Sequence, residues 1–280
     1  EAGIRFLDLA SLTHGLMGRY EIGIFPAGGV HWNALGVANA ADAILAELNR
    51  DGAVAPRLKW NYTITDRPTG SDRELIDLIR DSDALFLEGP RAVDDTSVLE
   101  GYRWLTEILS VALDCYLWAD EARPTIIPIV GPTRKFGGDN ADAGYTFAPL
   151  HPERSYRIRG VRGDACYLSL TVYGGPRDGR WSDRIVATLN DRAIQFAQGG
   201  SFEVLLSAHE QPGNWIRLDP DSVCVVTRDY LVHPKAGRPA SFAIECLDTV
   251  APPRLSDEEL ARRFQAAANF IRDMLKITPL

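Results

Sequence analysis

The chain has 280 residues, and its 30 Lys and Arg against 38 Asp and Glu give a formal net charge of −8. Hydrophobic residues make up 45% and charged residues 24%, so the chain has the composition of a globular protein and can build a large core without disulfide bonds. The acidic balance argues against nucleic acid as a partner, because phosphate contacts need clustered Lys and Arg. No apolar run reaches the ~20 residues that a membrane-spanning helix needs, so we expect no membrane partner either.

The four cysteines, Cys115, Cys166, Cys224 and Cys246, form no CxxC pair, and three of them lie in apolar, strand-like runs. A free cysteine in such a run behaves as a small buried hydrophobe. We therefore expect reduced thiols and a cytoplasmic protein. Removal of a leader before Glu1 would place the protein in the periplasm instead.

Residues 1–125 carry mainly helical patterns. Residues 34–50 repeat Leu and Ala at helical spacing. Ser71 and Glu74 form a capping box before a second helix. A third helix is expected from about residue 95 to residue 119. The sequence thus predicts a helical region over residues 1–125.

From about residue 145 the apolar period changes from 3.6 to 2, which is typical of strands. Asn190-Asp191 suits a tight hairpin turn between two of them. Ser256 and Glu259 cap a last helix. We predict an α+β protein, with the helical region packed on an antiparallel, jelly-roll-like β-sandwich over residues 126–280 that includes this C-terminal helix. The expected strands are 156–160, 166–172, 184–189, 193–197, 202–207, 223–232 and 241–247.

Familiar cofactor and nucleophile motifs are missing from the sequence. The five histidines never fall at i, i+2 or i, i+4, and there is no HExxH or paired-cysteine zinc pattern. GxSxG, GxGxxG and the phosphate-binding loop are also missing. We therefore expect no cofactor and no metal, although a metal site assembled from distant residues stays open.

Polar residues concentrate in one glycine-rich segment between the helical and strand patterns. One interpretation is a pocket in which Lys135 or Tyr145 moves a proton while Asp139 or Asp142 tunes it. The other is a connecting turn whose Asp and Asn bond their own backbone and whose Arg134 bridges to an acid. The polar residues of this segment are Arg134, Lys135, Asp139, Asn140, Asp142 and Tyr145.

The same segment resembles a bacterial family. Residues 134–145 read RKFGGDNADAGY and residues 156–164 read YRIRGVRGD, with shorter matches at 167–173, 213–215, 218–221 and 260–264. These motifs are similar to those of the domain-of-unknown-function family numbered 1214, over about residues 125–275. One departure is Ala141, where relatives often carry Pro. The resemblance implies a jelly-roll sandwich joined to helices and no particular reaction, and it favours a site lined by Arg134, Lys135, Asp139, Asn140 and Tyr145.

Other residues are candidates to join this site. Tyr173 and Arg157 lie on strand faces opposite the expected core, although a solvated face is the plainer interpretation of Arg157. Arg228 lies in an apolar strand, where a buried charge needs a distant acidic partner and can be purely structural.

The aromatic residues of the third helix offer a wall for the same site. One interpretation is ordinary core, and the other is the apolar side of a pocket against the glycine-rich loop, formed by Tyr102, Trp104, Tyr116 and Trp118. His31 would belong to a flap over that pocket.

These features favour a cofactor-independent enzyme, a lyase with a hydrolase as second choice, acting on a small apolar or aromatic, phenolic compound. Lys135 would be the base, Tyr145 the hydrogen-bond donor and Arg134 the group that holds an anionic substrate. The alternatives are a non-catalytic carbohydrate- or ligand-binding sandwich and a partner-binding protein. A homo-oligomer is compatible with each.

Overall fold

The computed structural model describes residues 70–82, 92–135, 137–250 and 256–277. Contacts divide the chain into two units, Glu1–Asp66 and Arg67–Leu280, and every described residue belongs to the second. The described helices that precede residue 126 are therefore part of the same unit as the sandwich. Among the described elements, helix gives way to strand between Leu117 and Ile127, and a domain boundary at 125/126 stays a prediction.

The described elements confirm the α+β class. Among the described helices, none combines the length and the apolar character needed to cross a bilayer. In chain order the elements are α3 (Gly70–Asp81), α5 (Asp95–Ala112), the π-helix η1 (Leu113–Leu117), β1 (Ile127–Val130), β2 (Ala143–Pro149), β3 (Tyr156–Val161), β4 (Ala165–Gly174), β5 (Arg184–Asn190), β6 (Ser201–Ser207), β7 (Trp215–Arg217), β8 (Ser222–Leu231), β9 (Ser241–Cys246) and α6 (Asp257–Ile277).

The strands form two stacked sheets. One has the order β1-β2-β8-β4-β5 and the other the order β7-β6-β3-β9. The chain passes back and forth between the sheets, as in a jelly-roll-like sandwich. All strand pairs are antiparallel except β6 with β7, which is parallel.

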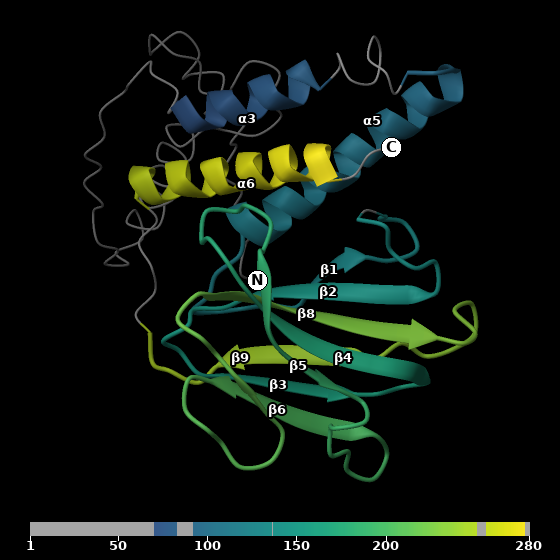
Figure 1. Ribbon diagram of the computed structural model, residues 1–280, viewed down its shortest axis with the longest axis vertical. Coiled ribbons are helices and arrows are strands. Elements are labelled where there is room, and N and C mark those ends of the chain that lie inside the picture. The colour runs from purple at the N-terminus through teal and green to yellow at the C-terminus, as the bar shows by residue number, and fades with distance from the viewer. Residues whose placement is uncertain (1–69, 83–91, 136, 251–255, 278–280) are drawn as a thin grey trace, which may run out of the picture. The chain divides into compact units, whose positions relative to one another are not determined.

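Helices cover the free face of the five-stranded sheet (Figure 1). Asp94 caps α5, accepting a 2.7 Å hydrogen bond from the backbone N–H of Ser97, whose hydroxyl in turn accepts one from the Asp94 N–H. The helix continues without a break into η1. Ser256 caps α6 as predicted, because its hydroxyl accepts a 3.2 Å hydrogen bond from the N–H of Glu259. Buried side chains of α5, η1 and α6 pack against β1, β2 and β8 in one core.

The five-stranded sheet therefore has a core on each side, and alternation along its strands decides which residue faces which. Leu168, Leu170 and Val172 of β4 point into the sandwich. Tyr173 packs on the opposite side, against the core shared with the helices. This second face supplies the candidate site.

The hairpin expected at Asn190-Asp191 is wrong, because residues 193–197 form no strand. The N–H groups of Ala193 and Ile194 both bond to the carbonyl of Asn190, and the N–H of Gln195 bonds to Asn214 Oδ1. Ile194 is nevertheless buried in the sandwich core. Burial, and not strand pairing, therefore explains the apolar residues at 193–197.

Three strands, β1, β2 and β7, are absent from the expected set. β1 contains Pro128 and pairs only with β2, which fits the rule that proline is confined to edge strands. β7 is only three residues long. Short strands of this kind leave too little pattern to detect.

The four cysteines are free in the structure. Cys115 and Cys224 are buried and Cys246 is intermediate, but Cys166 is exposed, which corrects the expectation that its strand-like run buries it. The helix expected over residues 34–50 lies outside the described residues.

Candidate functional site

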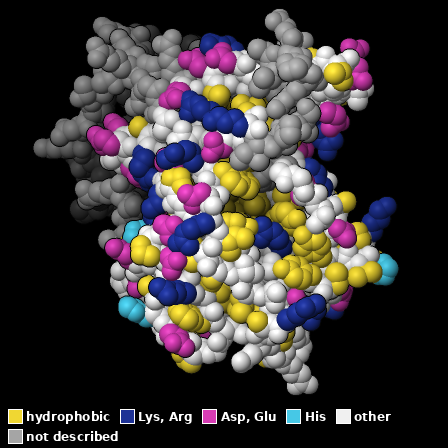
Figure 2. All heavy atoms as spheres, viewed as in Figure 1, with side chains coloured by type: hydrophobic (Ala, Val, Ile, Leu, Met, Phe, Trp, Pro, Cys, Tyr) yellow, Lys and Arg dark blue, Asp and Glu magenta, His cyan; other side chains and the backbone are white. Residues whose placement is uncertain are grey.

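A cavity of about 160 Å³ lies between the helical layer and the five-stranded sheet. Figure 2 shows hydrophobic side chains gathered in a recess between helices and sandwich, with a basic side chain among them. We call this space the Arg228 cavity. It is lined by Val111, Cys115, Tyr116, Ile129, Val130, Gly137, Tyr145, Phe147, Tyr173, Trp181, Ser182, Cys224, Val226, Arg228 and Phe270.

Strand register brings the polar residues of this cavity together. Tyr145 of β2 lies directly opposite Arg228 of β8, and Tyr173 of β4 lies opposite Cys224, four residues before Arg228 on the same strand. Side chains at alternate positions share a face, so Cys224, Val226 and Arg228 all point toward the helices. Three strands distant in sequence thus meet at Arg228.

Arg228 is half-buried, and its donors are bound by hydroxyl groups. Its Nη2 donates to the hydroxyl of Tyr173 at 2.6 Å, and its Nη1 lies 3.5 Å from Thr171 Oγ1. The guanidinium carbon lies 5.2 Å from the ring centroid of Tyr145 and 5.8 Å from that of Tyr173. The acidic partner expected from the sequence is not found among the described residues. The guanidinium therefore sits between aromatic faces without a neutralising carboxylate from that part of the chain.

Tyr145 is the second polar group of the cavity. Its hydroxyl lies 3.3 Å from that of Tyr230, which accepts a 2.9 Å hydrogen bond from Asn140 Nδ2. Burial raises the pKa of Tyr145, and the neighbouring Tyr230 raises it further. Tyr145 therefore stays protonated near neutral pH and can donate a hydrogen bond.

The helical side of the cavity is apolar, and the π-helix shapes it. π-Helical turns inside helices occur frequently at functional sites, and η1 carries Cys115 and Tyr116 into the wall. Burial raises the pKa of both groups and also raises that of Cys224 to about 12. These thiols are neutral and unreactive near pH 7, so they serve as apolar wall.

Arg134 does not enter the Arg228 cavity. It donates to the carbonyl of Pro128 at 2.7 Å and to Ser110 Oγ at 2.7 Å, and it forms an ion pair with Asp114 at 3.3 Å. These bonds tie the glycine-rich loop to the helices. Arg134 thus follows the plainer interpretation, a bridge to an acid, and not the expected role of binding an anionic substrate.

Lys135, Asp139 and Asp142 do not line the cavity either. Lys135 Nζ pairs with Asp139 Oδ2 at 3.0 Å, and the backbone N–H of Lys135 donates to Glu107. Asp142 is exposed, and its carbonyl accepts from the N–H of Leu231. Of the loop's described residues before β2, Gly137 is the one that lines the cavity.

Three further candidates lie elsewhere. Arg157 belongs to the four-stranded sheet, where it pairs with Glu203 at 3.4 Å and Glu245 at 3.0 Å. Trp104 is buried in the helix core, and Trp118 is 67% exposed; neither lines the cavity. Of the expected aromatic wall, Tyr116 lines the cavity. His31 lies outside the described residues.

The structure thus brings Tyr145, Tyr173 and Asn140 together and adds Arg228 and Tyr230. In the sequence, Arg228 stands out as a charged residue in an otherwise apolar strand, a pattern that is also compatible with a purely structural role. The sequence marks Tyr230 only by its position two residues after Arg228, which places both side chains on the same face of the strand. No group of three or more His, Cys, Asp or Glu side chains in the described part of the chain is arranged to hold a metal ion.

No protein-family model and no curated protein matches the chain. A crystal structure of an uncharacterized protein from Burkholderia cenocepacia is similar to it, with a TM-score of 0.67 and 28% identity over 74% of this chain. This chain spans 58% of the length of that protein. A structural-genomics protein from Vibrio parahaemolyticus aligns over 77% of this chain and 66% of its own, with 14% identity and a TM-score of 0.32. The chain therefore shares the fold of the first.

Proposed function

We propose that the protein binds a small aromatic acid in the Arg228 cavity. The observation that carries this proposal is the half-buried guanidinium of Arg228, which lies among tyrosine rings and has no carboxylate partner among the described residues. Burying a charge without a counter-charge is costly, so an anionic group brought by a ligand would complete the site.

The size and lining of the cavity support one aromatic ring. An engineered apolar cavity of about 150 Å³ in another protein binds benzene, and the Arg228 cavity measures about 160 Å³. Phe147, Val226 and Phe270 supply apolar wall, while Tyr145 can donate a second hydrogen bond to the anion. Such a lining suits an aromatic carboxylate or phenolate better than a carbohydrate.

Catalysis is the second candidate, and Tyr145 is the observation that favours it. A tyrosine with a raised pKa beside an arginine can stabilise the negative charge that develops on an enolate or phenolate during a lyase reaction. The expected base, Lys135, is paired with Asp139, and no described carboxylate or histidine lines the cavity. Binding is therefore the better-supported function.

The test compares benzoate with the neutral benzyl alcohol, followed by calorimetry and by the fluorescence of Trp181, which lines the cavity. Wild type should bind benzoate at least tenfold more tightly. Arg228→Gln should remove this preference, a loss of about 10- to 100-fold for benzoate, because a charge-assisted hydrogen bond contributes about 1.5–3 kcal/mol.

The matched control is Arg157→Gln, which removes a guanidinium on the other sheet and should leave both affinities unchanged. The melting temperature of each variant separates lost binding from lost folding. The proposal is wrong if wild type shows no saturable benzoate binding, or if Arg228→Gln keeps the preference for the acid.

We propose two further properties. Membership of the domain-of-unknown-function family numbered 1214 is supported by the motif at residues 134–145. A cytoplasmic location is supported by the four free cysteines, which a reducing compartment preserves.

A further inference from the structure

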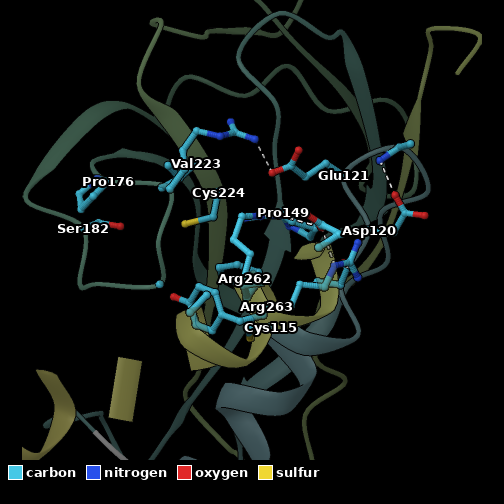
Figure 3. A pocket seen from close by; sticks show the side chains of 18 of the residues that line it. Cys115, Asp120, Glu121, Pro149, Pro176, Ser182, Val223, Cys224, Arg262 and Arg263 are labelled. Atoms are coloured by element: carbon cyan, nitrogen blue, oxygen red, sulfur yellow. Dashed lines mark hydrogen bonds and ion pairs between the residues drawn. The ribbon is translucent and has the colours of Figure 1, made fainter. Parts of the chain in front are cut away.

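A second cavity, of about 260 Å³, lies beside the first and has a different chemical character. It shares Cys115, Tyr116, Phe147, Ser182 and Cys224 with the Arg228 cavity, so these side chains lie between the two spaces. Figure 3 shows it enclosed by residues of η1, the strands, the β4–β5 loop and α6. We call it the arginine pocket, because it is lined by Arg154, Arg177, Arg180, Arg262 and Arg263.

The carboxylates around this pocket are already engaged. Glu121 pairs with Arg177 at 2.5 Å. Glu259 forms ion pairs with both Arg262 and Arg263 at 2.8 Å. These two arginines lower the pKa of Glu259 to about 2. Glu259 therefore stays ionised, yet it neutralises only one of its two arginines.

The remaining acids are paired in the same way. Asp178 binds Arg180 at 2.9 Å, and Asp120 is occupied by Arg123, also at 2.9 Å. The lining arginines and Arg123 thus outnumber their four carboxylates by two. The described part of the pocket carries a net positive charge.

Arg154 accounts for part of this excess. It is half-buried, it lines the pocket, and no ion pair joins it to a carboxylate of the described residues. The nearby His151 is consistent with this, because burial lowers its pKa and the positive charges of Arg177 and Arg154 lower it further. A cavity of this kind attracts an anion.

We propose that the arginine pocket binds an oxyanion, the phosphate or carboxylate group of a small molecule. Guanidinium groups form planar forks that match both groups and bind them more strongly than neutral donors do. Pro149, Pro176 and Val223 add an apolar wall beside the arginines, where the rest of such a molecule can lie. This site does not depend on a ligand in the Arg228 cavity.

The test measures the affinity of the full chain for inorganic phosphate and for acetate by calorimetry, at constant chloride concentration in a buffer free of oxyanions. We expect one saturable site for at least one of the two anions. Acetate that competes with phosphate would indicate a general oxyanion site, and binding of one anion alone would identify the group. Saturable binding of neither would overturn the proposal.

Arg154→Gln should weaken this binding about tenfold or more. It leaves no described carboxylate without its partner, so the fold should persist, and the melting temperature checks this. Arg177→Gln, which removes a second lining guanidinium, provides a second test. Unchanged binding by both variants would overturn the proposal.

Two controls locate the effect. Arg217→Gln removes a guanidinium whose side chain is 67% exposed and lies outside the pocket, and it should bind like wild type. If Arg217→Gln weakened anion binding as much as Arg154→Gln does, the effect would come from the overall charge of the protein, and the proposal would be overturned. Arg228→Gln should leave phosphate binding intact, and Arg154→Gln should leave the effect of Arg228→Gln on benzoate affinity intact, so the two sites can fail separately.

Discussion

Arg228 and Asp229 are neighbours on β8 with opposite surroundings, because successive side chains of a strand point to opposite faces. Arg228 faces the cavity below the helices. Asp229 is 5% exposed, and its Oδ2 accepts a 3.0 Å hydrogen bond from the N–H of Ala240. Burial raises the pKa of Asp229 despite this bond. The alternation of side chains along β8 thus places Arg228 in the candidate site and buries Asp229 on the opposite face of the sheet.

Replacing Asp229 by Asn should become more favourable as the pH rises. A carboxyl whose pKa is raised in the folded state holds its proton more tightly there, so its contribution to stability is present below its unfolded pKa of about 3.9 and is lost as the pH rises through the folded value. The amide oxygen of Asn keeps the acceptor for Ala240 and never ionises. The difference in unfolding free energy between Asp229→Asn and wild type should grow by at most ~1.4 kcal/mol per pH unit between these two pKa values. Urea unfolding at pH 4 and pH 7 measures it.

Asp164→Asn is the matched control with the opposite sign. Hydrogen bonds from Arg238 lower the pKa of Asp164, so its contribution is present at neutral pH and is lost on acidification. The loss occurs below the unfolded pKa of about 3.9, so this variant should be more harmful at pH 7 than at pH ~2.5. A pH-independent effect of Asp229→Asn would show that Asp229 is not held with a raised pKa.

At the scale of elements, the β4–β5 loop joins the sheet to α6. Asn269 Nδ2 donates to the carbonyl of Asp178 at 2.8 Å, and the N–H of Trp181 donates to Asp273 Oδ2 at 2.8 Å. Between them Gly179, at φ 85°, lies so close to the Ala266 carbonyl that a Cβ would clash with backbone. Residues of this loop line both cavities, so its docking on α6 shapes both candidate sites.

Gly179→Ala should destabilise the protein more than the same change at Gly199. Both glycines have positive φ, where a side chain costs ~1 kcal/mol or more, but a Cβ at Gly199 meets nothing within 4 Å. The clash at Gly179 involves backbone, which cannot move aside as a side chain can, and should add at least ~1 kcal/mol. Denaturant unfolding of the two variants measures the difference, and equal losses would mean that the loop does not need this close approach.

At the scale of the whole molecule, the five-stranded sheet lies between two cores. One core fills the sandwich, and the other joins the sheet to α5, η1, α6 and α3. Residues 67–125 supply much of the second core, including Trp104, Ile108 and Cys115. The sandwich is therefore expected to need the helices that precede it.

A fragment of residues 67–280 should fold, because it corresponds to the compact unit defined by contacts. A fragment of residues 126–280 should fail, because loss of α5 and η1 exposes Phe147 of the sheet and Phe270 of α6. Circular dichroism and urea unfolding should show one cooperative transition for the first fragment and aggregation or dye binding for the second. Cooperative unfolding of a monomeric 126–280 fragment would instead favour a boundary at 125/126.

Much of this fold follows from local patterns. Alternation located strands such as β4 and β8, and the cap at Ser256 located α6, because these signals act between residues close in sequence. Residues 193–197 show the limit of this reasoning. Their apolar side chains enter the core from an irregular segment that Asn214 holds, and the two-residue period cannot distinguish that from a strand.

The sequence by itself determined the α+β class, most strands, and the presence of a tyrosine-rich and arginine-rich set of residues. Only the tertiary structure decided which of them meet. The glycine-rich loop was rich in polar residues, yet Arg134 and Lys135 bind Asp114 and Asp139, whereas Arg228 meets Tyr145 and Tyr173 through the pairing of β2, β8 and β4. Composition shows which charges a segment carries. Whether a charge is neutralised by its neighbours or left for a ligand depends on contacts between strands distant in sequence, which no local pattern records.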